Sequence, residues 1–157
     1  MSPNPADVLQ ANWRKSQCPE ISGVVDSVGE GSILPVKLCL SPNETSTPAK
    51  LDRFELSSLA IWMDRPDSRW AHCCELYEIK DYSINLAVGC GEAAGNGNQG
   101  FIASSRISDG ALYWIAFFPN SNPFAKCELI NGRVVAHSTI GITVTVALDN
   151  PTDISLI

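Results

Sequence analysis

The chain has 157 residues, of which 45% are hydrophobic and 18% charged, and these proportions fit one globular domain with a sizeable core. It carries 17 acidic residues against 11 basic ones, and Lys and Arg stand singly apart from the adjacent Arg14 and Lys15. Because a surface with a net charge of −6 repels phosphate groups, we expect no nucleic acid and no membrane among its partners.

The beginning of the chain does not resemble a signal peptide, because residues 1–17 contain no basic segment followed by an apolar stretch. No apolar run approaches the roughly 18 residues of a transmembrane helix. These features favour a cytoplasmic protein, with secretion as the alternative if a signal peptide has been removed. The six cysteines stand mostly in apolar, strand-like runs without the regular spacing of small secreted scaffolds, which indicates reduced thiols.

A short helix is predicted near the N-terminus. Asn4 is a good capping residue, and Pro5 suits the first helical position. The apolar residues that recur on one helical face are Ala6, Leu9 and Trp13. We therefore expect residues 1–18 to form a helical arm that docks on the rest of the protein through Trp13.

After this arm the sequence takes on the character of strands. Three segments alternate between apolar and polar residues, a period of two that is typical of half-buried strands: PVKLCL at 35–40, DYSINLAV at 81–88 and ITVTVAL at 142–148. The segment ALYWIAFF at 111–118 is apolar on both faces. We expect it to be a central strand that is covered on each side.

Turn residues separate the strands of the C-terminal half. Asp109-Gly110 and Asn131-Gly132 each stand between two apolar segments, and both dipeptides are typical of type I′ hairpin turns. From residue 101 onward, the sequence thus predicts an antiparallel meander of about five strands by turn counting.

Residues 51–63 have two interpretations. Phe54 and Leu56 fit one strand phase and Leu59 the opposite one, as if a β-bulge lay at Ser57-Ser58. A helix beginning at Asp52 is the alternative, because the apolar residues of this segment also follow a helical period. The sequence does not decide between strand and helix here.

Together these segments predict an all-β fold, either a β-sandwich or a partly closed antiparallel barrel, with one short N-terminal α-helix. We expect about eight to ten short strands by turn counting, in a single β domain that spans residues 1–157. The expected core includes Val36, Leu38, Ile84, Leu86, Leu112, Trp114, Val144 and Val146.

The segment GCGEAAGNGNQG at 89–100 contains the spacing of a dinucleotide-binding motif, with Gly95, Gly97 and Gly100 at GxGxxG positions. Such a motif needs a helix that begins within the glycine turn, because the helix N-terminus binds the pyrophosphate. Here the glycines precede the alternating segment FIASSRIS, which predicts a strand. We therefore interpret this segment as a connection between strands, which either binds a partner or is disordered.

Two small groups of residues could bind a metal ion or act in catalysis. His72 and Cys74 lie two residues apart on one strand face, where both could bind one zinc ion, although CxxC and HExxH motifs are absent. Cys90, flanked by two glycines, could act as a nucleophile if the fold placed His137 beside it. Chance alone provides such pairings in a chain with six cysteines and two histidines.

No stretch carries a family signature, so the function prediction rests on the class of fold. We expect a non-catalytic domain that binds a protein or carbohydrate partner through loops at one end of the strands, without a cofactor. The candidate binding residues are the polar tips of two predicted loops: Asn96, Asn98, Gln99, Asn120 and Asn122. A small cysteine- or zinc-dependent enzyme is the alternative, and the sequence leaves open whether the protein is an enzyme.

Overall fold

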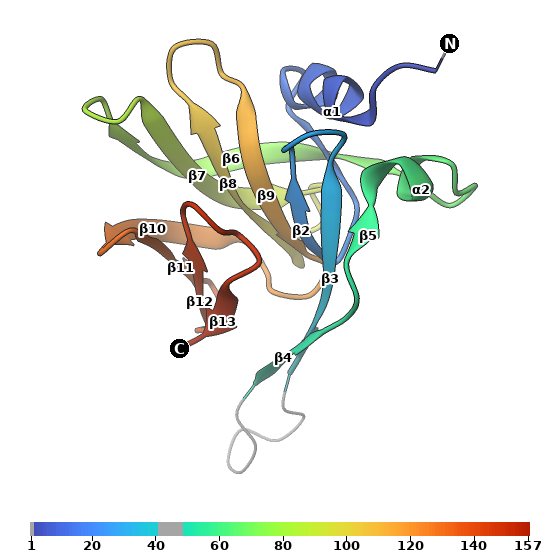
Figure 1. Ribbon diagram of the computed structural model, residues 1–157. Helices are drawn as coiled ribbons and strands as arrows, with labels where there is room; N and C mark the ends of the chain where they lie inside the picture. Colours follow the sequence, from blue (N-terminus) through green and yellow to red (C-terminus); the bar gives the residue numbers. More distant parts are fainter. Residues whose placement is uncertain (1, 41–48) are drawn as a thin grey trace.

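A computed structural model describes residues 2–40 and 49–157 (Figure 1). The described chain contains thirteen strands, more than expected, and two short helices, α1 (Pro5–Trp13) and α2 (Leu59–Met63). The strands are β1 (Gln17–Pro19), β2 (Gly23–Asp26), β3 (Ser32–Cys39), β4 (Lys50–Arg53), β5 (Ser57–Ser58), β6 (Trp70–Asp81), β7 (Leu86–Ala93), β8 (Gln99–Arg106), β9 (Leu112–Phe118), β10 (Phe124–Ile130), β11 (Arg133–Ser138), β12 (Thr143–Ala147) and β13 (Ile154–Leu156).

The strands form two antiparallel sheets, which makes the fold an all-β, sandwich-like one, as expected. The larger sheet has nine strands in the order β1-β6-β7-β8-β9-β2-β3-β4, with β5 paired to β3. The smaller sheet is the meander β10-β11-β12-β13. In Figure 1 the smaller sheet lies below the larger one, whereas α1 lies above it. None of the helices in the described chain is long and apolar enough to cross a membrane.

Both faces of the larger sheet are buried along its central strands β7, β8, β9 and β2. The first core lies between the sheets, where Trp114 and Phe118 of β9 meet Phe124 of β10. The second core lies on the opposite face of the larger sheet, under α1 and α2, and includes Ile115 and Phe117. Because neighbouring residues of β9 alternate between the two cores, the expectation of a central strand that is covered on each side is confirmed.

Local sequence explains why α1 forms and where it docks. The Asn4 side chain accepts a hydrogen bond from the Ala6 amide at 2.9 Å, and Pro5 opens the helix, as predicted. Trp13 packs edge-to-face on Phe101 of β8, with ring centroids 6.4 Å apart. The arm therefore docks through Trp13, and the surface that receives it is the larger sheet.

Residues 51–63 adopt both of the structures that the sequence left open. Strand β4 ends at Arg53, and α2 begins only at Leu59, well after Asp52. The Ser58 side chain accepts a hydrogen bond from the Ile61 amide at 3.1 Å and so caps α2. The change of phase at Ser57-Ser58 thus marks the start of a helix instead of a β-bulge.

Two expectations about strands and turns were wrong. Residues 82–85 form a turn, because the Asp81 carboxylate accepts a hydrogen bond from the Ser83 amide at 3.0 Å. Ile84 consequently stands 57% exposed and is not a core residue. At the β8–β9 connection only Gly110 has a positive φ, so this turn is not type I′, whereas Asn131 and Gly132 both have positive φ as that turn requires.

One side of the sandwich is bridged by a single arginine. Arg53, at the end of edge strand β4, donates hydrogen bonds from its guanidinium group to the carbonyl oxygens of Thr152, at 2.8 Å, and Ile154. Ile154 belongs to β13, the edge of the smaller sheet. The two sheets therefore stay separate but are connected by side-chain contacts on this side.

Candidate binding site

The predicted loop residues gather at one end of the sandwich. The backbone amide of Asn122, in the β9–β10 connection, donates a hydrogen bond to the carbonyl oxygen of Asn98 in the β7–β8 turn, at 3.0 Å. The Asn120 side chain donates to the Leu38 carbonyl at 2.8 Å, and the Gln99 side chain is 3.4 Å from Glu20. The side-chain amides of Asn120 and Gln99 thus make contacts within the fold, while Asn96 and Asn98 are exposed.

The glycine-rich segment is a turn between two strands, as interpreted from the sequence. Gly95 and Gly97 both have positive φ, and the Gly97 amide donates to the Glu92 side chain at 3.0 Å. Gly100 lies within β8, where a Cβ atom would collide with the Asn122 carbonyl group. No helix begins here, so this turn lacks the helix N-terminus that a dinucleotide cradle requires.

The fold does not bring Cys90 and His137 together. Cys90 is completely buried between the two sheets, beside Cys127 of β10. His137 is half exposed on β11, where its ring contacts Thr143 at 3.0 Å and Glu128 at 3.5 Å. Its strand neighbour Ala136 faces the first core, so His137 points the opposite way. Nothing in this arrangement activates the Cys90 thiol.

His72 and Cys74 do share the exposed face of β6, whereas Cys73 between them is buried. The sequence therefore predicted their common face correctly. A zinc site needs about four ligands. In residues 2–40 and 49–157 no group of three or more His, Cys, Asp or Glu side chains is placed to hold a metal ion.

The sequence did not predict a cavity at the opposite end of the sandwich, which we call the end pocket. It encloses about 350 Å³ between the β2–β3, β6–β7 and β12–β13 connections and the start of β9. Its lining is mainly apolar and consists of Asp26, Val28, Ile84, Leu86, Tyr113, Trp114, Leu148, Asp149 and Pro151. Val28 and Ile84 are among the most exposed apolar side chains in the protein.

A hydrogen bond between the two sheets holds the floor of the end pocket. Trp114 is 2% exposed, and its indole N–H donates a hydrogen bond to the Leu148 carbonyl at 3.1 Å. This bond connects β9 of the larger sheet to the β12–β13 connection of the smaller one. The floor of the pocket is therefore preformed, which lowers the ordering cost of binding.

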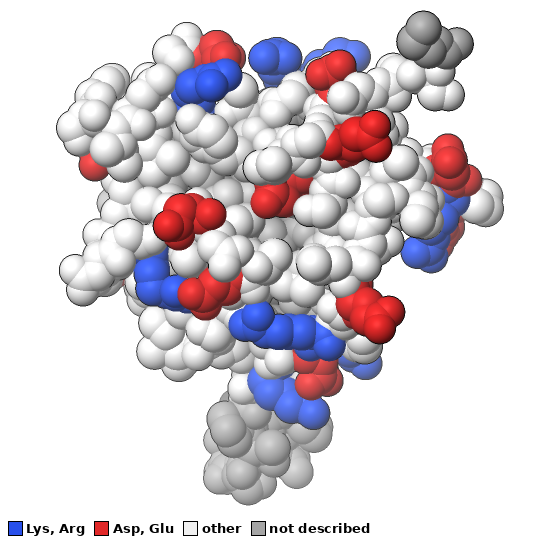
Figure 2. All heavy atoms as spheres, viewed as in Figure 1, with Lys and Arg blue, Asp and Glu red and all other residues white. Residues whose placement is uncertain are grey.

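Two carboxylates stand at the rim of this apolar cavity. Asp26 accepts a hydrogen bond from the Val28 amide at 2.9 Å, and Asp149 is exposed. Among the described residues, neither forms an ion pair with a Lys or Arg. In the view of Figure 2, acidic side chains are spread over a surface that is otherwise largely uncharged at its centre. The site thus combines an apolar interior with unpaired negative charge.

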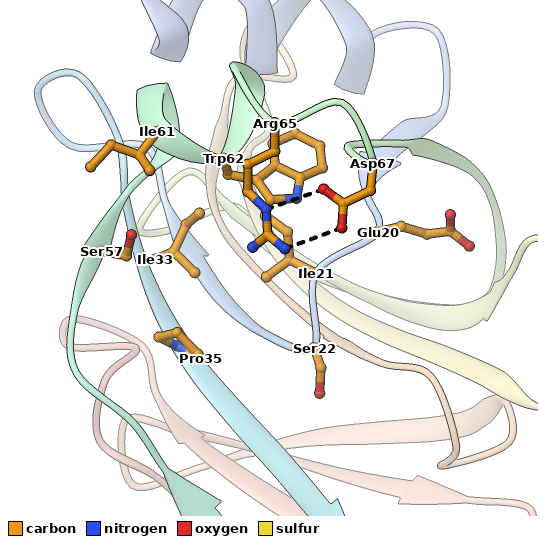
Figure 3. Close-up of a pocket in the computed structure, with 10 residues that line it drawn as sticks. All are labelled: Glu20, Ile21, Ser22, Ile33, Pro35, Ser57, Ile61, Trp62, Arg65 and Asp67. Carbon is orange, nitrogen blue, oxygen red and sulfur yellow. Dashed lines mark hydrogen bonds and ion pairs between the residues drawn. The ribbon is translucent and has the colours of Figure 1, made fainter.

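A second cavity of about 290 Å³ lies beside α2 (Figure 3). Its apolar wall includes Ile33 and Trp62, and its rim carries Arg65, Asp67 and Glu20. Arg65 binds Asp67 through two hydrogen bonds of 3.1 Å each, and Glu20 contacts the Gln99 side chain. Because these charged groups already have partners in the fold, this cavity offers less to a ligand than the end pocket.

The sequence matches no family model and no curated protein, and the structure matches no solved structure.

Proposed function

We propose that the protein is a non-catalytic binding domain whose end pocket holds a segment of a partner protein. The apolar cavity receives an aliphatic or aromatic side chain, and a neighbouring Lys or Arg of the same segment contacts Asp26 and Asp149. The observation that carries this proposal is the coincidence of a solvent-exposed apolar cavity with two carboxylates that lack basic partners in the described chain. Apolar anchors inserted into pockets dominate the energetics of protein interfaces.

The lining of the end pocket favours a protein segment over a carbohydrate. A sugar presents several hydroxyl groups and needs both donors and acceptors from its site. The side-chain donors here are the Tyr113 hydroxyl and the Trp114 indole, and the indole is already bound to Leu148. An apolar side chain with a cationic neighbour satisfies the lining without requiring further donors.

A random peptide library panned against the protein tests the proposal. We expect the enriched peptides to contain an apolar residue next to Lys or Arg. Their binding, followed by fluorescence polarisation of labelled synthetic copies, is expected to weaken at least about tenfold in Ile84→Arg, because the new side chain blocks the pocket and repels the basic residue. Asp26→Asn combined with Asp149→Asn is expected to reduce both the affinity and its dependence on salt.

Ile140→Arg is the matched control, because Ile140 is also an exposed isoleucine but lies in the β11–β12 turn at the opposite end. Its peptide affinity is expected to equal that of the unmodified protein. Peptides that bind Ile84→Arg undiminished, or a library without enriched peptides, would contradict the proposal. Saturable binding to an immobilised glycan that Ile84→Arg abolishes would show instead that the pocket takes a carbohydrate.

A further inference from the structure

Cys18 and Cys73 lie side by side in the second core, beneath the N-terminal arm. Strand β1 pairs with β6 so that Cys18 is opposite Ala71, and the Cys73 amide donates a hydrogen bond to the Ser16 carbonyl at 2.7 Å. The two cysteines are therefore diagonal neighbours on one face of the sheet. Both side chains belong to the second core, and the neighbouring Cys73 thiol together with burial raises the pKa of the Cys18 thiol.

One member of this pair is reachable from solvent. Cys73 lines a cavity of about 230 Å³ with Trp13, Ser16, Glu75 and Phe101, and it is 8% exposed. Cys18 is 1% exposed and lies behind it. The order of access is thus fixed, because a small reagent in the cavity meets the sulfur of Cys73 first.

A second pair of thiols provides a contrast within the same molecule. Cys90 and Cys127 are also neighbours in one core, but both are completely buried between the two sheets. Neither side chain lines the end pocket, the cavity beside α2 or the cavity at Cys73. A reagent reaches them only when the sandwich opens.

We propose that Cys18 and Cys73 are a reversible disulfide site that reacts with small disulfides of the glutathione class. The Cys73 thiol loses its proton to water, and its thiolate attacks one sulfur of the glutathione disulfide and releases one glutathione thiolate. The Cys18 thiol then gives up its proton to water as its sulfur attacks the Cys73 sulfur. The Cys18–Cys73 bond forms, the bond between Cys73 and glutathione breaks, and the second glutathione leaves as a thiolate that takes up a proton from water. Two cysteine thiols are oxidised, and one glutathione disulfide is reduced to two thiols.

The position of Cys18 suits this second step. Diagonal neighbours lie somewhat farther apart than the Cα separation of a relaxed disulfide, so one strand has to shift slightly. In the described chain β1 is an edge strand of three residues that pairs only with β6, and it follows Ser16, whose φ is +60°. The bond would tie the arm, residues 1–18, covalently to the larger sheet.

The test is native oxidation with oxidised glutathione, followed by blocking of free thiols, unfolding and peptide mapping by mass spectrometry. Cys74→Ser is used as the background, because Cys74 is exposed and adjacent to Cys73. We expect a Cys18–Cys73 disulfide and free thiols at Cys90 and Cys127. In addition, Cys18→Ala is expected to stop the reaction at a mixed disulfide between Cys73 and glutathione.

A structural readout accompanies the chemistry. Amide hydrogen exchange in α1 is expected to slow at least severalfold in the oxidised protein and to recover after reduction with dithiothreitol, because the bond restrains the arm. Cys73 remaining reduced or stopping at the mixed disulfide in the presence of Cys18 would overturn the proposal. Oxidation of Cys90 and Cys127 ahead of Cys18 and Cys73, or unchanged exchange in α1, would overturn it as well.

Discussion

The Glu75 carboxyl group lies directly over the backbone of Gly89. A Cβ atom at position 89 would overlap the Glu75 carboxyl group. The absence of a side chain at Gly89 lets the carboxyl group lie against the sheet, where burial and the nearby charge of Glu78 raise the pKa of Glu75 to about 7, against a smaller opposing effect of Lys80.

This shift predicts how stability depends on pH. Because the pKa of Glu75 is higher in the folded than in the unfolded protein, the folded state binds the proton more tightly, and its stability falls as pH rises from the usual value of 4.5 to about 7. Glu75→Gln has no carboxyl group to titrate, so it removes this loss of folding stability at high pH. Since Glu75 is substantially exposed and screened by solvent, we expect the variant to be more stable at pH 8 by on the order of 1 kcal/mol.

Urea unfolding at pH 4 and pH 8 measures the effect. At pH 4 the carboxyl group is mostly protonated in both states, so the two proteins are expected to differ little. An equal difference in unfolding free energy at the two pH values would show that the substitution acts through packing and not through the titration of Glu75.

At the scale of elements, the Gln10 side chain joins α1 to the sheet by hydrogen bonds. The Gln10 amide group donates to the Leu112 carbonyl and accepts from the Leu112 backbone N–H, both at 2.8 Å, and so extends the pairing of β9. In Gln10→Ala the Leu112 N–H loses its partner, whereas its carbonyl oxygen keeps a bond from Ser27. We expect a loss of about 1–3 kcal/mol in the free energy of unfolding, typical of an unsatisfied buried donor.

Asn12→Ala is the control on the same helix, because the Asn12 side chain bonds only to the Val8 carbonyl within α1. Chemical denaturation is expected to show a much smaller effect for this variant. Equal losses in the two variants would mean that the intrinsic stability of the helix, and not the contact with Leu112, accounts for the result.

The alternation of apolar and polar residues predicted the strands that have one buried face. It failed where a local side-chain contact favours a turn or a helix over a strand. The segment at 142–148 contains β12, as its pattern indicates. The segment at 81–88 has the same alternation, but the Asp81 side chain turns the chain before β7 begins. Likewise, the Ser58 cap starts α2 within a segment that also fits a strand. Such side-chain contacts depend on conformation, and a pattern of apolar residues does not contain them.

At the scale of the whole molecule, sequence reasoning found one group of loops and missed the end pocket. The β7–β8 turn and the β9–β10 connection were predicted as loops because their Gly and Asn residues have turn propensities. The pocket instead depends on residues far apart in the chain, from Asp26 to Pro151, which meet only after both sheets are packed. Its local signals were two apolar residues in turns, Val28 and Ile84, and the alternation had assigned Ile84 to the core.

The two sheets are expected to unfold as one cooperative unit. Each sheet has an apolar face that is buried only while the other sheet packs against it. Phe118 ends β9 in the larger sheet, and Phe124 opens β10 in the smaller one, with ring centroids 5.9 Å apart and both rings fully buried. Phe124→Ala leaves a cavity between the sheets, and we expect it to reduce the free energy of unfolding by about 3–5 kcal/mol. Circular dichroism and tryptophan fluorescence, followed during urea unfolding, are expected to give a single coincident transition for both proteins.

Tyr82→Ala, which removes a ring that is 74% exposed, is the control and is expected to change stability by less than about 0.5 kcal/mol. Two separate transitions, with Phe124→Ala affecting only one of them, would show instead that the smaller sheet is an independent folding unit.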